Sequence, residues 1–241
     1  MDNQNELDML NKIAGEYIEP SADRRVDREL MCFIVPDVLN SVNGPSVLEM
    51  GIGDDAWTSA VIERFGHSHI VDAAAPLVKR TKDKYSSRVT CDCSLFECYN
   101  PDRKYDDIMA FYILEHVDDP VLVLMQCKKW LKGNGRIHIL VPHAGSLHRR
   151  LAVCMGLQER PEELGKSDNI IGHRRVYTIE AMEGDIKKAG LNIAKKSGYG
   201  CKLVPNSMMT SWNSDVLRGI AVLGSDLPIE YSSALYYQCT N

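Results

Sequence analysis

Short apolar runs alternate with longer amphipathic stretches along most of this chain, and the two patterns predict different elements. Residues 46–51 and 69–74 have the apolar content of buried strands, whereas residues 56–66 carry apolar side chains at helical spacing. The same patterns predict further strands at 88–93, 105–112 and 136–142, and further helices at 76–85 and 119–135. Strands that are separated by crossover helices form a parallel sheet with helices on both faces. The pattern therefore predicts an α/β fold.

The first 44 residues have a different pattern, which favours two helices separated near residues 19–23. In the second helix Pro36 should kink or interrupt the backbone, because proline lacks the N–H group that the helix needs. The apolar residues at helical spacing in that helix are Val26, Leu30, Ile34 and Val38. We expect an N-terminal helical cap over residues 1–44 and a main domain over residues 45–241.

The stretch after the fifth predicted strand is polar and irregular over residues 145–175, which indicates an insertion or a lid. Beyond it the pattern predicts a helix at 178–190 and a strand at 191–200. A helix at 211–224 then precedes a last strand at 234–241. An edge strand at this end could pair between subunits, but the sequence leaves the oligomeric state open.

Composition narrows the functional classes. The formal charge of −5 is spread along the chain without a basic block, so we expect no nucleic-acid partner. The polar start does not resemble a signal peptide, and no apolar run approaches the length of a membrane span. We therefore expect a cytoplasmic protein without a membrane partner. There the eight cysteines stay reduced, and Cys91, Cys93 and Cys98 lack the second ligand pair of a zinc site.

A glycine pair lies directly after the first predicted strand. Gly51 and Gly53 would let the backbone approach a ligand, although a glycine pair by itself also fits a plain strand-to-helix turn. Asp72 ends the second strand 19 residues after Gly53, where a carboxylate could accept hydrogen bonds from ribose hydroxyls. Asp54 and Asp55 place negative charge where the pyrophosphate of a dinucleotide would lie. A ligand with ribose, a positive centre and no phosphate fits better, and S-adenosylmethionine is such a ligand.

Five segments in order resemble a known enzyme family. They are "VLEMGIGDD", "HIVDAA", "YDDIMAFYILEHVDDP", "WLKGNGRIHILVPHAGSLHRRLA" and "GHRRVYTIEAMEGDIKKAGL", which together span about residues 45–195. They resemble the successive motifs of class I S-adenosylmethionine-dependent methyltransferases, in the branch that methylates small molecules and natural products. The resemblance implies a Rossmann-like, mostly parallel sheet of seven strands with the last strand inserted antiparallel. It also implies S-adenosylmethionine as cofactor, S-adenosylhomocysteine as product, and an oxygen or nitrogen of a small-molecule acceptor as the methyl target.

Carried over residue by residue, the resemblance implies cofactor contacts at ten positions. Glu49, Gly51 and Gly53 would line the methionine part, and Asp72 would hold the ribose. Cys93, Ser94 and Leu95 would face the adenine, Phe111 and Tyr112 would border the sulfonium, and Tyr17 would reach the carboxylate from the N-terminal helices. One position departs from the family: Asp55 stands where the turn usually carries a third glycine.

Methyl transfer to an oxygen needs a base, whereas an amine only needs to arrive neutral. The catalytic candidates are His116, His143 and His173, and for His116 a structural role in its loop is an equal alternative. In ubiquinone-pathway O-methyltransferases a similar stretch binds a metal with the help of an upstream glutamate. Tyr112 occupies that upstream position here, so we expect no metal, and a metal at Glu115 and His116 stays open as the lesser alternative.

Basic residues near the lid provide candidate substrate contacts. Arg149, Arg174 and Arg175, with Tyr177 beside them, could clamp an anionic acceptor, since guanidinium groups form paired hydrogen bonds to anions. The alternative is that these arginines cap helices and form surface ion pairs, which are usually weak. Two other functions stay open: methylation of a protein or a polysaccharide sugar, and a sensor or partner subunit that binds the cofactor without transferring the methyl group.

Overall fold

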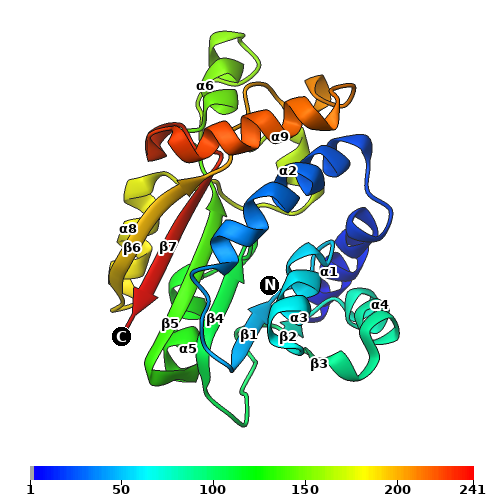
Figure 1. Cartoon of the computed structure of the whole chain (residues 1–241), viewed down its shortest axis with the longest axis vertical. Helices are drawn as coiled ribbons and strands as arrows, with labels where there is room; N and C mark the ends of the chain where they lie inside the picture. The colour runs from blue at the N-terminus through cyan, green and yellow to red at the C-terminus, as the bar shows by residue number, and fades with distance from the viewer. Residues whose placement is uncertain (1–2) are drawn as a thin grey trace.

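The strands form one sheet through the middle of the molecule, in the order β3-β2-β1-β4-β5-β7-β6 (Figure 1). The computed structural model describes residues 3–241. The first five strands pair in parallel, and β7 pairs antiparallel with both β5 and β6. The strand bounds are β1 Val47–Met50, β2 Ser68–Asp72, β3 Val89–Cys93, β4 Tyr105–Phe111, β5 Leu131–Pro142, β6 Asn192–Tyr199 and β7 Ala234–Thr240. The predicted Rossmann-like sheet of seven strands, with its last strand inserted antiparallel, is therefore confirmed.

Helices cover both faces of the sheet, also as predicted (Figure 1). Successive residues of a strand point to opposite faces. In β4, Ile108 packs in the cluster that includes α5 and α8, whereas Met109 packs in the cluster that includes α2 and α3. The helix bounds are α1 Asn3–Ile18, α2 Ala22–Leu39, α3 Ala56–Phe65, α4 Ala75–Tyr85, α5 Pro120–Trp130, α6 Leu147–Cys154, α7 Lys166–Ile170, α8 Ile179–Lys188 and α9 Ser214–Leu223.

Two local predictions need correction. Pro36 does not interrupt its helix, because α2 continues to Leu39. Pro36 lies in the last turn of α2, and its carbonyl still accepts a hydrogen bond from the N–H of Asn40. The helix expected over residues 119–135 ends at Trp130, and β5 begins at the next residue. Gly133 and Gly135, which suggested a turn, lie inside this longer strand, where its register against β4 shifts. Gly133 is exposed and Gly135 is buried.

The segment predicted as a lid, residues 145–175, contains two short helices, α6 and α7. It crosses between the sheet and the N-terminal helices, and its backbone hydrogen bonds include His173 N–H to Asp168 O and Arg174 N–H to Glu115 O. In residues 3–241, no helix has both the length and the apolar content to cross a membrane.

Candidate functional site

A cavity of about 470 Å³ lies at the carboxyl ends of the parallel strands. Residues that follow β1, end β2 and follow β4 line it together, since parallel strands end at the same edge of the sheet. Side chains of α1 and α2 line it as well, and the lid contributes residues from α6 and α7. The volume is within the range of sites that enclose a small ligand.

The turn after β1 has a left-handed backbone at three residues: φ is +75° at Gly51, +55° at Gly53 and +67° at Asp55. A Cβ atom on Gly51 would lie 2.4 Å from Cδ1 of Ile113, so another residue here would have to displace the end of that side chain as well as adopt the left-handed backbone. Asp55 therefore follows the path of the third glycine of the family. Its carboxylate lies 2.7 Å from Nζ of Lys84 and does not line the cavity, whereas Asp54 does.

The conformation of Asp55 leads to a stability prediction. Asp55→Gly should change the free energy of unfolding by less than about 1 kcal/mol, because relief of the left-handed strain offsets the lost ion pair. Asp55→Val should cost about 2–3 kcal/mol, since a β-branched residue tolerates this backbone poorly. Urea unfolding measures both, and Lys84→Met is the control that removes the ion pair alone. Equal losses for the glycine and valine variants would contradict the backbone explanation.

Asp72 connects the turn to the end of β2. Its two carboxylate oxygens accept the N–H groups of Ile52 at 2.8 Å and Ala74 at 2.7 Å. Burial raises the pKa of this carboxyl, while the two N–H groups oppose the rise. Each carboxylate oxygen has a further lone pair, so Asp72, which lines the cavity, can also accept a hydrogen bond from a ligand hydroxyl.

Three residues with predicted cofactor contacts lie outside the cavity. Glu49 accepts hydrogen bonds from the hydroxyls of Thr58 at 2.7 Å and Ser68 at 2.9 Å, and burial raises its pKa to about 8. Glu49 therefore binds side chains of α3 and β2 and does not line the cavity, where a contact with the methionine part of the cofactor was expected. Cys93 and Ser94 also lie off the cavity lining, whereas Leu95 is part of it.

Aromatic residues border the cavity near the exit of β4. Phe111, Tyr112 and Tyr17 all line it, and their contacts with the cofactor stay a prediction. Tyr112 has a φ of +56°, which is rare for a bulky residue and costs on the order of 1–3 kcal/mol. The ring of Tyr17 lies 3.6 Å from the position that a Cβ on Gly53 would take, so α1 closes directly over the glycine turn.

The three candidate histidines all line the cavity, but their surroundings differ. Burial, together with the charge of His173, lowers the pKa of His116 to about 3, which makes it a weak base. Nδ1 of His143 lies 3.0 Å from the carbonyl of Ser232. Nδ1 of His173 lies 2.8 Å from Oδ1 of Asp168. Only His173, of these three, is held by a carboxylate in hydrogen-bond contact.

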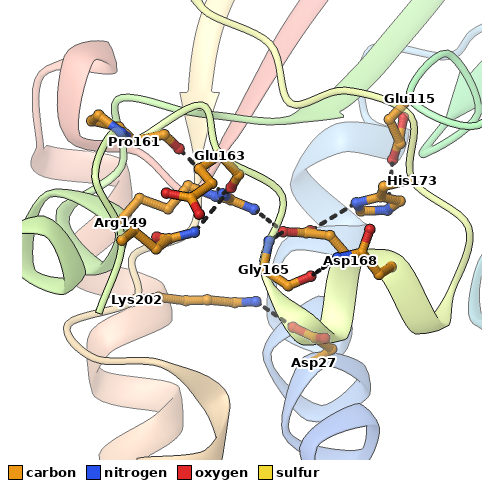
Figure 2. Close-up of polar contacts among 11 residues, drawn as sticks. Asp27, Glu115, Arg149, Pro161, Glu163, Gly165, Asp168, His173 and Lys202 are labelled. Atoms are coloured by element: carbon orange, nitrogen blue, oxygen red, sulfur yellow. Dashed lines mark hydrogen bonds and ion pairs between the residues drawn. The ribbon is translucent and has the colours of Figure 1, made fainter. Parts of the chain in front are cut away.

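His173 belongs to a chain of polar side chains that crosses the lid (Figure 2). Asp168 lies between His173 and Arg149, whose Nη2 is 2.6 Å from Oδ2 of Asp168. On its other side His173 points towards Glu115, with 3.9 Å between Nε2 and Oε1. Among residues 3–241, Glu115, His116 and His173 also form a group whose donor atoms lie within 4.8 Å of one another, a possible cation site.

The arginines with predicted substrate contacts serve backbone carbonyls instead. Nη1 of Arg175 donates to the carbonyls of Leu114 and Val117, and Nε of Arg174 donates to the carbonyl of His116. Arg174, Arg175 and Tyr177 lie outside the cavity lining. Arg149 lines it, but its guanidinium is occupied by Asp168 and by the carbonyls of Pro161 and Glu163. The expected clamp for an anionic acceptor is therefore not formed by these side chains.

Asp168 was missed as a functional candidate from the sequence, and Glu115 was considered there only as a metal ligand. Glu115 is fully buried, lines the cavity, and accepts no hydrogen bond from another residue in 3–241. Glu115 directly precedes His116 and follows the fourth strand, and this position could have indicated a role in the active site. Asp168 lies in the irregular lid, and nothing in its local sequence indicates that it reaches His173.

Comparison with known proteins agrees with this geometry. A family model described as a methyltransferase domain matches residues 22–196. The ubiquinone biosynthesis O-methyltransferase of Pasteurella multocida is 28% identical over 152 residues, which cover 56% of this chain and 62% of that protein. Its counterpart in Bradyrhizobium diazoefficiens is 28% identical over 133 residues, or 54% of this chain and 50% of that protein. The chain thus spans less than two thirds of these relatives.

The fold also matches solved structures. The N-methyltransferase NodS from Bradyrhizobium japonicum, determined with S-adenosyl-L-homocysteine, superposes with a TM-score of 0.57 at 13% identity. The match covers 97% of this chain and 98% of that one. At this identity the likeness concerns the fold alone.

Proposed function

The chain belongs to the methyltransferase-domain family, and from this premise we propose that it transfers a methyl group from S-adenosylmethionine to an oxygen or nitrogen of a small metabolite. The observation that carries the proposal is one cavity of about 470 Å³ shared by the glycine turn, Asp72 and the exit of β4. Gly51, which has a φ of +75°, lines this cavity without a side chain. These features fit a ligand with a ribose and a close backbone contact.

We propose the following division of roles. Gly51 and Gly53 hold the methionine part, Asp72 the ribose, Leu95 the adenine, and Phe111, Tyr112 and Tyr17 the region of the sulfonium. Residues 1–44 serve as a cap, since side chains of α1 and α2 line the cavity. The cytoplasmic location expected from the sequence stays a prediction.

When bound, S-adenosylmethionine supplies a methyl carbon that is already activated by the sulfonium. The protein has to align the acceptor with this carbon and exclude water. His173 is the base in this proposal, because Asp168 fixes its ring at a hydrogen-bond distance of 2.8 Å while Nε2 faces the interior. A carboxylate that orients a histidine in this way selects the tautomer that accepts a proton on the other nitrogen.

Calorimetric titration with S-adenosylmethionine tests the cofactor, with NADH as the comparison. We expect saturable binding of S-adenosylmethionine and none of NADH. Asp72→Ala should weaken binding at least about tenfold, the size expected for a lost hydrogen bond to a charged group. Asp92→Ala is the matched control, because Asp92 lies on the adjacent strand β3 outside the cavity. Thermal melting checks that both variants fold. No binding by the folded wild-type protein would refute the proposal.

A further inference from the structure

The carboxylate of Glu115 lacks any hydrogen-bond donor from another described residue. Glu115 is 0% exposed, and in residues 3–241 no other residue donates to Oε1 or Oε2. The side chain lines the cavity, so a ligand there can reach it. A buried carboxylate without partners is costly. Such a group is expected to find its donor in a ligand.

Nε2 of His173 lies 3.9 Å from Oε1 of Glu115, and it is an acceptor as well when Nδ1 carries the ring proton (Figure 2). Asp168 forms an ion pair with Arg149 at 2.6 Å and also accepts the backbone N–H of Gly165 at 2.8 Å. Asp168 is thus an anion that only accepts, which places the proton of a neutral His173 on Nδ1. Nε2 then faces Oε1 of Glu115 across 3.9 Å, too far for a hydrogen bond. Two acceptors face one another with no donor between them.

The charge of the cavity favours the same kind of ligand group. Eight carboxylates but only five Lys or Arg side chains line it, a formal balance of −3 with the histidines neutral. Of the arginines, Arg149 is already paired with Asp168. An anionic group close to Glu115 would meet repulsion from the Glu115 carboxylate.

We propose that Glu115 and His173 form the acceptor subsite, which takes an amine or hydroxyl group as hydrogen-bond donor and rejects carboxylates. The inference rests on the proposed function. An amine satisfies both acceptors with two N–H groups, and a hydroxyl satisfies one. On transfer the acceptor lone pair forms the bond to the methyl carbon, and the electron pair of the breaking carbon–sulfur bond stays on sulfur. The proton that the acceptor releases passes to Nε2 of His173.

Three probes of matched size test this subsite: benzylamine, benzyl alcohol and benzoate. Their binding to the 241-residue chain is measured by saturation-transfer NMR and calorimetry, with and without saturating S-adenosylhomocysteine, in buffer with EDTA. We expect benzylamine to bind most tightly, benzyl alcohol more weakly and benzoate not at all. Glu115→Gln should weaken benzylamine binding by about tenfold or more. Glu183→Gln, which changes a glutamate of α8 outside the cavity, should leave it unchanged.

Failure of cofactor binding and failure of the acceptor subsite give different results. Failure of S-adenosylhomocysteine to bind concerns the cofactor, and the probes are then compared without it. Benzoate binding as tightly as benzylamine would overturn the subsite, as would undetectable binding of all three probes. Benzylamine binding that is unchanged in Glu115→Gln would also overturn it. Binding that appears only when MgCl₂ or ZnCl₂ replaces EDTA would replace the direct contact with a metal bridge at Glu115, His116 and His173. Retained S-adenosylhomocysteine binding shows that a variant is folded.

Discussion

Asp107→Ala should lower the free energy of unfolding by about 3–5 kcal/mol, a loss typical of breaking a buried ionic network. Asp107 in β4 is fully buried, and its carboxylate lies 2.9 Å from Nε of Arg136 and 2.8 Å from Nε2 of His138. It also accepts the backbone N–H groups of Asn43 and Gly44, at the entry to β1. The variant leaves all of these donors without their acceptor.

Urea unfolding of Asp107→Ala measures this loss, and the adjacent Asp106→Ala is its control. The side chain of Asp106 is 20% exposed and pairs with Lys132, so its removal should cost only about 1 kcal/mol. Burial tends to raise the pKa of Asp107, but the hydrogen bond and charge of His138 hold it below its ordinary value. The wild-type advantage should therefore shrink as the pH falls below about 4, the ordinary range of a free aspartate. Equal losses for the two variants would refute the network as the cause.

Glu115→Gln should instead stabilise the protein, by about 2–3 kcal/mol at pH 8.5. Burial raises the pKa of Glu115 from 4.5 to about 7. Between these values the folded state binds more protons than the unfolded state, so stability falls as the pH rises through this window. Well above pH 7 Glu115 is charged in the folded state, and its buried charge then lowers the free energy of unfolding by the full amount. Glutamine has no charge and avoids this cost. A residue that destabilises the fold in this way is typical of a functional site.

Thermal melting at pH 8.5 and pH 4.5 measures the effect. We expect the variant to melt roughly 5–10 °C higher at pH 8.5, and close to the wild type at pH 4.5. Glu49 titrates in the same direction, but it is present in both proteins and its contribution cancels. Glu183→Gln, on the surface of α8, should shift neither melting point. A gain of the same size at both pH values would exclude titration of Glu115 as its origin.

The sheet was predictable because most of its strands contain short apolar runs and the crossover helices carry apolar residues at helical spacing. The exception among the strands is β6 (Asn192–Tyr199), most of which is exposed. The turn at Gly51 and Gly53 was predictable for a related reason, since positive φ and close approach restrict the residue type locally. Pro36 was overestimated as a helix breaker. It lies in the last turn of α2, where few hydrogen bonds remain to be lost.

The acceptor side of the cavity was harder to predict, because its contacts join distant segments. Sequence spacing suggested Arg174 and Arg175 as substrate contacts, but their donors meet carbonyls of residues 114–118, about sixty positions earlier. Asp168 and His173 are neighbours in the lid, but the role proposed for them depends on Glu115. That residue follows β4 and lies on the other side of His173. Local pattern carries no information on such a pairing.

The lid supplies one part of the cavity as a single continuous segment of the chain. Residues 145–175 contribute His148, Arg149, Asp168 and His173 to the cavity, but none of the glycine turn and not Asp72. Under the roles proposed here, the base His173 lies in this segment, whereas Glu115, the other half of the acceptor subsite, lies after β4 and the methyl-donor site also lies outside the segment. Exchange of this one segment between relatives would therefore change the surroundings of the base while Glu115 and the donor site are inherited intact, which makes the segment a unit for engineering acceptor preference.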